Sequence, residues 1–111
     1  MTETATQPEE LYPTIPKQSV RERVLRAARS AEEARWEVVN ERRIGGEKLY
    51  HSWATCSAGW LMEREAVLGA YVSDWAYLFG GLDACHAAVA AERARVRADL
   101  DAKLAEEGTD A

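Results

Sequence analysis

The sequence predicts an all-α protein, and three observations lead to this class. Hydrophobic residues make up 47% of the 111 residues and charged residues 30%, which is the balance of a globular chain rather than a disordered one. The chain has only 7 Gly and 3 Pro, too few for a loop-rich all-β fold. Apolar residues recur at helical spacing along three long segments, and no long alternation of the strand type occurs.

Residues 1–18 are expected to form an extended tail ahead of the helices. Pro13 and Pro16 favour extended or polyproline-like backbone in this segment. Its large apolar side chains are Leu11, Tyr12 and Ile15. Two interpretations stay open: the tail folds back over the end of the bundle, or it is a docking peptide for a groove on a partner protein.

The first helix is expected to begin at Ser19 and to end before Gly45. Ser19 and Glu22 fit a capping box, and Arg42 and Arg43 suit the negative end of the helix dipole. A heptad-like seam with steps of four and three is formed by Val20, Val24, Ala27, Ala31, Ala34 and Val38. The opposite face is interpreted as solvated, including the acidic patch Glu32, Glu33, Glu37 and Glu41.

The second helix is expected to run from about Glu47 to Phe79, and it is apolar nearly all round. A stripe of mostly small residues is formed by Ser52, Thr55, Gly59, Met62, Ala66, Gly69, Ser73, Ala76 and Gly80. Such a stripe lets a neighbouring helix approach closely. A helix without a polar face is normally buried on all sides, which a three-helix monomer cannot provide. This helix is therefore expected to meet another protein surface; the alternative is a break near Gly59 that gives a four-helix packing.

The third helix is expected to span about Leu82 to Glu107, with residues 108–111 frayed. A second small-residue stripe is formed by Ala84, Ala87, Ala91, Ala94 and Ala98. Gly80 and Gly81 allow a tight reversal between the second and third helices, so the two stripes are expected to face each other. The predicted domain at residues 19–107 is thus an Ala/Gly-rich antiparallel hairpin with the first helix packed alongside.

The sequence predicts no metal, cofactor or catalytic site. The soft metal-ligand candidates are His51, Cys56, Cys85 and His86. Their spacings match no zinc knuckle, and neighbours at these spacings diverge around a helix. The alternative function is a metal-binding or small-ligand-binding bundle, or an enzyme, that uses His51 and His86 with neighbouring carboxylates.

The charge balance and the segment pattern bound the partners and the location. The net charge of −5 argues against nucleic-acid binding, which normally needs a basic surplus. No segment reaches the about 20 apolar residues of a membrane span, and the first residues lack the pattern of a signal peptide. A cytoplasmic location with reduced cysteines is expected.

The function expected from these features is protein–protein interaction, in a small acidic helical module. Such a module would self-associate or dock on a partner, as an assembly subunit or as a regulator or inhibitor. Aromatic side chains are enriched at the energetic centres of interfaces. The candidate partner-binding residues are Trp53, Trp60, Tyr71 and Trp75 on the second helix, with Leu11, Tyr12 and Ile15 on the tail.

Overall fold

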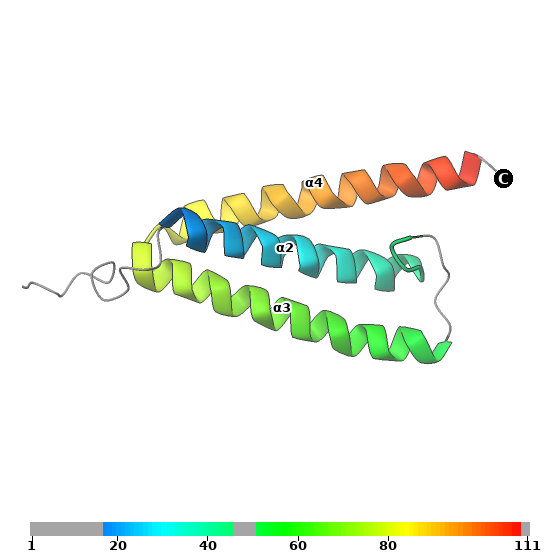
Figure 1. Cartoon of the computed structure of the whole chain (residues 1–111), viewed down its shortest axis with the longest axis horizontal. Coiled ribbons are helices and arrows are strands. Elements are labelled where there is room, and N and C mark those ends of the chain that lie inside the picture. Colours follow the sequence, from blue (N-terminus) through cyan, green and yellow to red (C-terminus); the bar gives the residue numbers. More distant parts are fainter. Residues whose placement is uncertain (1–16, 46–50, 110–111) are drawn as a thin grey trace, which may run out of the picture.

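A computed structural model describes residues 17–45 and 51–109, and side chains within residues 18–45 and 58–107. This part of the chain forms three helices, α2 (Lys17–Asn40), α3 (His51–Phe79) and α4 (Leu82–Thr109), as Figure 1 shows. The predicted all-α class with three long helices is confirmed. The predicted tail lies outside the described residues, apart from its last two positions, which belong to α2.

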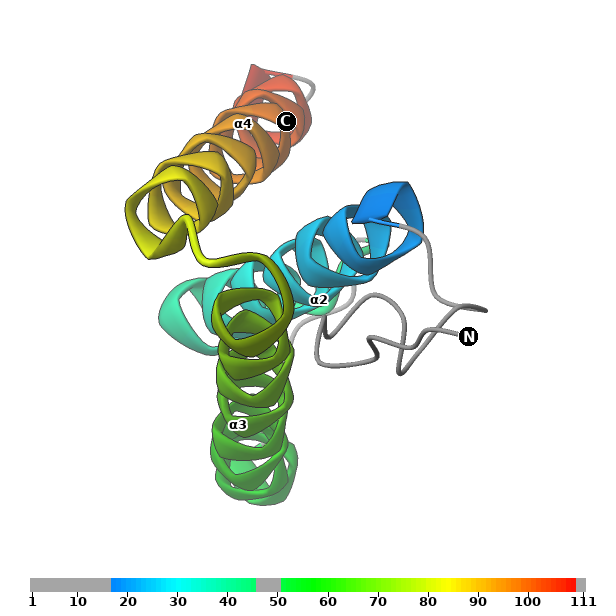
Figure 2. The same cartoon turned by 90° about the vertical axis from the view of Figure 1, so that its left-hand side faces the viewer.

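Helix α2 lies between the other two helices and packs against both (Figures 1 and 2). Helices α3 and α4 form the predicted antiparallel hairpin, but they diverge from each other with distance from their connecting turn. The central position of α2 explains its small inner residues, because two neighbouring helices must both approach it closely. The three helices therefore form an open arrangement in which α3 and α4 each have one outer face.

The core follows the seam predicted on α2. Its main cluster joins the first half of α2 to the turn end of the hairpin, and its buried members are Val20, Val24, Ala27, Ala28, Ala31, Leu68, Trp75 and Cys85. A smaller cluster holds α4 to the second half of α2 through Trp36, Val96 and Leu100. The indole Nε1 of Trp36 donates to Asp101 Oδ1 at 3.0 Å, so this buried ring is also hydrogen-bonded.

Helix α2 ends at Asn40, which corrects the prediction that it continues to the residues before Gly45. The amide of Glu41 donates to the carbonyl of Val38 at 3.4 Å, and the amide of Arg42 donates to the carbonyl of Glu37 at 3.1 Å. This pair of bonds is a Schellman closure, and Glu41 takes its left-handed position with φ of 53°. The predicted stop at a glycine was wrong because a non-glycine residue occupies the position that glycine usually takes.

Helix α3 is continuous through Gly59, so the alternative of a helix broken there is wrong. It ends at a turn in which Gly80 and Gly81 both have positive φ, 77° and 44°. The Gly80 amide donates to the Ala76 carbonyl at 3.1 Å, which closes the last turn of α3 before the chain reverses. Within the described ranges, none of the helices combines the length and the apolar character needed to cross a membrane.

Candidate functional site

The outer face of α3, turned away from α2, is exposed and largely uncharged. Its large side chains are Met62 and Tyr77, with 73% and 66% of their surface exposed. Val67, 43% exposed, lies at the edge of this face toward α2. Between and around them lie exposed small residues, which are Gly59, Ala66, Gly69, Ala70 and Ser73. We call this set of eight residues the α3 outer face.

The opposite side of α3 carries the residues that pack on α2. Leu68 and Trp75 are buried and seven residues apart, so they lie on one side of the helix. Ala66 and Ser73, also seven apart, lie on the other side and are exposed. The stripe of small residues was predicted correctly as a stripe, but its described members from Gly59 to Ser73 face outward rather than toward α4.

Helix α4 repeats this arrangement. Its exposed alanines, which we call the α4 alanine face, are Ala84, Ala87, Ala91, Ala94 and Ala98. They lie opposite Cys85, Val96 and Leu100, which face α2. The expectation that the two stripes face each other is therefore wrong, because α2 occupies the inner side of both helices.

The structure separates the aromatic residues that the sequence groups as partner-binding. Trp75 is 7% exposed and belongs to the core, where it meets Phe79 edge to face at 6.3 Å between ring centroids. Trp60 and Tyr71 are half-buried, Tyr71 on the side of α3 toward α2, and the guanidinium of Arg64 lies 4.5 Å over the Trp60 ring. Trp75 is thus a packing residue within this chain, whereas Trp60 and Tyr71 keep exposed surface.

Four other candidate residues lie outside what the structure describes. Tail residues Leu11, Tyr12 and Ile15 precede the described range, and the side chain of Trp53 is not described although its backbone belongs to α3. Their assignment as partner-binding residues stays a prediction.

The sequence-based interpretation missed a buried carboxylate at the centre of the molecule. Glu32 on α2 has no exposed surface, and two guanidiniums from α4 donate to it: Arg93 Nε to Oε1 and Arg97 Nε to Oε2, each at 2.9 Å. Arg35 adds a third bond at 3.1 Å. The acidic patch on α2 is therefore not a solvated face, because Glu32 is enclosed by its arginine partners.

Glu37 is the second buried member of that patch. Its Oε2 accepts a hydrogen bond from the amide of Ile44 at 2.7 Å. This bond holds the chain that follows α2 back against the helix. The carboxylate thus has a structural role, in satisfying a backbone donor just beyond the helix end.

The charges of this network stabilise one another. Burial by itself raises the pKa of Glu32, but hydrogen bonds from Arg97 and Arg93 outweigh burial and leave the pKa below its ordinary value. The pKa of Glu65 is also lowered, chiefly by its hydrogen bonds with Arg93. Both carboxylates are consequently ionised at neutral pH, and they function as fixed anions rather than as proton-transfer groups.

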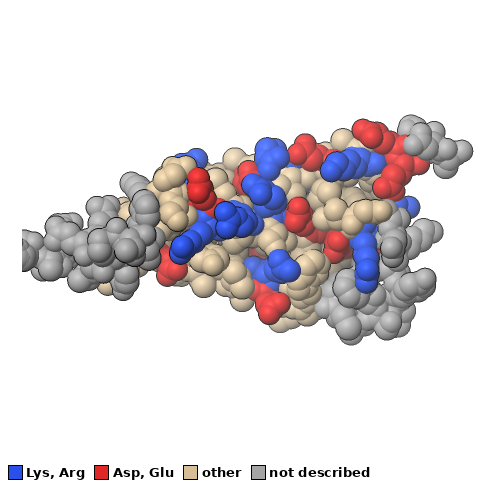
Figure 3. All heavy atoms as spheres, viewed as in Figure 1, with Lys and Arg blue, Asp and Glu red and all other residues tan. Residues whose placement is uncertain are grey.

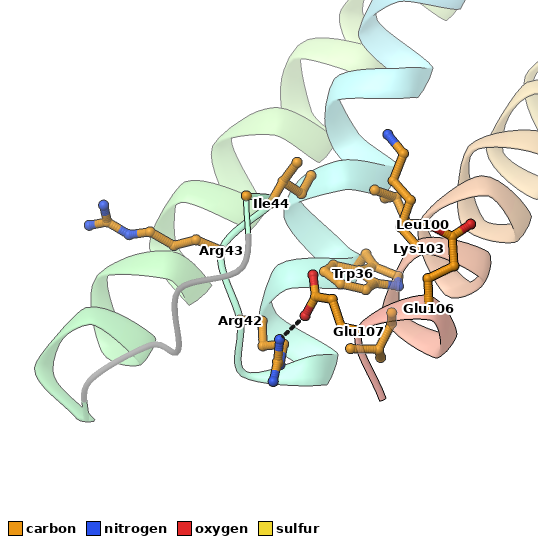
Figure 4. A pocket seen from close by; sticks show the side chains of 10 residues that line it. Trp36, Arg42, Arg43, Ile44, Leu100, Lys103, Glu106 and Glu107 are labelled. Carbon is orange, nitrogen blue, oxygen red and sulfur yellow. Dashed lines mark hydrogen bonds and ion pairs between the residues drawn. The ribbon is translucent and has the colours of Figure 1, made fainter. Parts of the chain in front are cut away.

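A cavity of about 530 Å³ lies at the end of the molecule opposite the turn between α3 and α4. It is formed between the chain after α2 and the last turns of α4. Trp36, Leu100 and Leu104 form its apolar side, and the ion pair between Arg42 and Glu107 crosses it (Figure 4). The remaining charged lining residues are Arg43, Lys103 and Glu106. Charges of both signs line this cavity, so it does not favour one sign of ligand.

The metal-ligand candidates do not converge in the described part of the chain. No group of three or more His, Cys, Asp or Glu side chains placed to hold a metal ion occurs there. Cys85 is buried in the core, and this burial raises the pKa of its thiol, whereas His86 is exposed. The side chains of His51 and Cys56 lie outside the described residues.

Comparisons of the chain with protein-family models, with curated proteins and with solved structures yield no match. The candidate site therefore rests on the geometry of the chain itself.

Proposed function

We propose that this chain is a helical protein–protein interaction module that self-associates through the α3 outer face. The observation that carries the proposal is the exposure of Met62, Val67 and Tyr77 around a strip of Gly and Ala on a helix with few charged residues. Contiguous apolar surface of this kind marks interaction sites in soluble proteins. Small residues between the larger ones let a second helix approach to about 8 Å between axes.

Charge favours the α4 alanine face of a second copy as the occupant. Glu63 and Asp74 are eleven residues apart on one edge of the α3 outer face, and both are exposed. In an antiparallel pair of α3 helices, Glu63 of one copy would meet Asp74 of the other, and like charges repel. The α4 alanine face is instead flanked by Arg95 and Arg97, whose side chains are 53% and 47% exposed. Each already pairs with a carboxylate of its own chain, Asp99 and Glu32 respectively, so an acidic edge of a second copy would add to these pairs rather than meet free cations.

The area of this contact sets the expected strength. With 29 residues, α3 is about 43 Å long, and a strip about 10 Å wide gives on the order of 400 Å². Stable complexes bury about 800 Å² per partner, so one such contact is weak. Each copy offers one face on α3 and another on α4, so copies can join head to tail into larger assemblies.

Light scattering coupled to size-exclusion chromatography tests this proposal, at roughly 10 to 500 µM protein to cover weak association. The average mass is expected to rise with concentration. Ala66→Arg, at the centre of the α3 outer face, should abolish this rise, and Ala91→Arg on α4 should do the same. Gln18→Arg, which adds the same charge at an exposed site on α2, is the control and should associate as the parent does.

Mixing the two blocked variants separates the contact geometries. If α3 of one copy binds α4 of the next, Ala66→Arg retains an intact α4 face and Ala91→Arg an intact α3 face, so the mixture forms dimers. Association that is lost in Ala66→Arg but kept by Ala91→Arg alone would instead indicate contact between α3 helices, and two blocked variants that stay monomeric when mixed would overturn the pairing of α3 with α4. A parent chain that is monomeric at every concentration, with full helix content, would refute self-association.

A further inference from the structure

A second surface feature is a groove of about 200 Å³ between α2 and α3, which adjoins the α3 outer face and shares only Val67 with it. Its lining residues are Arg23, Arg26, Ala27, Ser30, Arg64, Val67 and Tyr71. Three of these side chains are guanidiniums and none is a carboxylate, although the whole chain has a net charge of −5. Figure 3 shows basic side chains gathered over the N-terminal half of α2, which supplies two of the three.

The positive charge of this groove is not neutralised by the described residues. Arg64 lies over the Trp60 ring and donates to the hydroxyl of Ser30, so both of these partners are uncharged. No hydrogen bond or ion pair of Arg23 or Arg26 is found within the described part of the chain, and the carboxylate nearest along α2, Glu22, shares with Arg26 a separate hollow on the far side of that arginine's helix turn. Arg29, one turn further along α2, differs because it pairs with Glu92 at 3.1 Å. Three guanidiniums without a carboxylate form a site for an anionic ligand.

We propose that this groove binds the acidic N-terminal segment of the same chain. Residues 1–16 contain Glu3, Glu9 and Glu10 and no Lys or Arg. The sign of their charge is therefore complementary to that of the groove. The apolar residues that follow Glu10 on this segment can pack on Val67 and Tyr71, which form the apolar wall of the groove.

The lengths along the chain fit this occupant. Arg23 and Arg26 lie about 9 and 14 Å along the axis from Lys17, where α2 begins. An extended chain from Glu10 to Lys17 reaches about 23 Å, so Glu9 and Glu10 can lie beside either arginine. Tethering gives such a segment an effective concentration in the millimolar range, which favours it over an acidic peptide from another protein.

Carbodiimide coupling in the full-length chain tests this inference, because it joins a carboxylate to a lysine amine only when the two are in contact. Arg26→Lys keeps the charge and supplies the amine. Peptide mass mapping should find a cross-link from position 26 to Glu9 or Glu10. Arg21→Lys is the matched control, since Arg21 is exposed about 160° around α2 from Arg23. The tether brings the tail within reach of both positions, but only docking in the groove holds its carboxylates against position 26, so we expect about tenfold less coupling at position 21.

Two further arms exclude other origins of the cross-link. Coupling in an equal mixture of unlabelled and ¹⁵N-labelled chains should give products of single-isotope origin, as expected within one molecule. Glu9→Gln combined with Glu10→Gln should remove the product. Equal coupling at positions 21 and 26, or products of mixed isotopes, would overturn the inference; the second result would assign the groove to a neighbouring chain.

Discussion

The Nε atom of Arg93 on α4 lies 2.9 Å from Oε1 of Glu32 on α2, whose side chain has no exposed surface. The same guanidinium donates two hydrogen bonds to Glu65 on α3, at 2.9 and 2.6 Å. One side chain therefore joins all three helices midway along the molecule, where α3 and α4 have already diverged. A buried charge without a partner is costly, so the network also favours the arrangement in which all its members meet.

Glu32→Gln is expected to destabilise the fold by about 3 kcal/mol, because it leaves Arg93 and Arg97 without their buried counter-charge. Urea unfolding followed by circular dichroism measures this change. The control is Glu33→Gln, at the next, half-buried position, for which a change within about 0.5 kcal/mol is expected. Equal losses in the two variants would show that the buried network does not stabilise the fold more than a surface charge does.

The sequence was sufficient to predict the helices and the inner seam of α2, because both are encoded by local periodicity. Val20, Val24 and Ala31 recur at helical spacing, and this pattern alone identifies the face that is buried. The end of α2 could not be predicted to the residue. Glu41 adopts a conformation that favours glycine, and the sequence gives no sign of this.

The position of the acidic residues could not be predicted either. Glu32 and Glu33 are neighbours in one acidic patch, and only the partner helix distinguishes them. The two α4 arginines that enclose Glu32, Arg93 and Arg97, lie more than sixty residues later in the chain, beyond any local pattern. The prediction that the two small-residue stripes face each other was wrong for a related reason. Small residues at helical spacing identify a face for close approach, but they do not identify which helix approaches it.

Acid is expected to weaken the fold through this network and through Glu92, which pairs with Arg29 and Arg95. The folded-state pKa values of Glu32, Glu65 and Glu92 are all lower than the ordinary value of 4.5. Their stabilising contribution is therefore complete above the unfolded-state pKa, and it is lost as the pH falls through the folded-state values. The melting temperature should not change through these groups from pH 7 to about 5.5, and should fall below about pH 4.5.

Glu32→Gln identifies the source of this acid sensitivity. The variant has one fewer carboxylate to protonate in the buried network, so its melting temperature should decline less steeply with acid than that of the parent. Melting curves at intervals between about pH 3 and 7 measure both slopes. Parallel declines for the two proteins would assign the acid sensitivity to carboxylates outside this network.

The contact between Arg93 and Glu65 is expected to contribute less than that between Arg93 and Glu32. Glu65 is 40% exposed, so water screens this pair. A double-mutant cycle with Glu65→Ala and Arg93→Ala isolates the pair and should give a coupling energy of about 1 kcal/mol. Arg93→Lys should recover only part of the stability, because a lysine cannot keep the paired bonds to Glu65 together with the bond to Glu32. Full recovery by lysine would mean that charge alone, without the guanidinium geometry, holds the helices together.

Glu41→Gly is expected to stabilise the protein. Glu41 has φ of 53° at the Schellman closure of α2, a conformation in which a side chain is strained and glycine is not. Removing this side chain should raise the free energy of unfolding by about 0.5 to 1 kcal/mol, measured by urea unfolding. The matched control is Glu33→Gly in the interior of the same helix, where glycine should lower it by about 1 kcal/mol. Opposite signs at the two positions would locate the strain at the helix end. A loss at both would mean that the Glu41 backbone is not strained, since the entropic cost of glycine would then act alone.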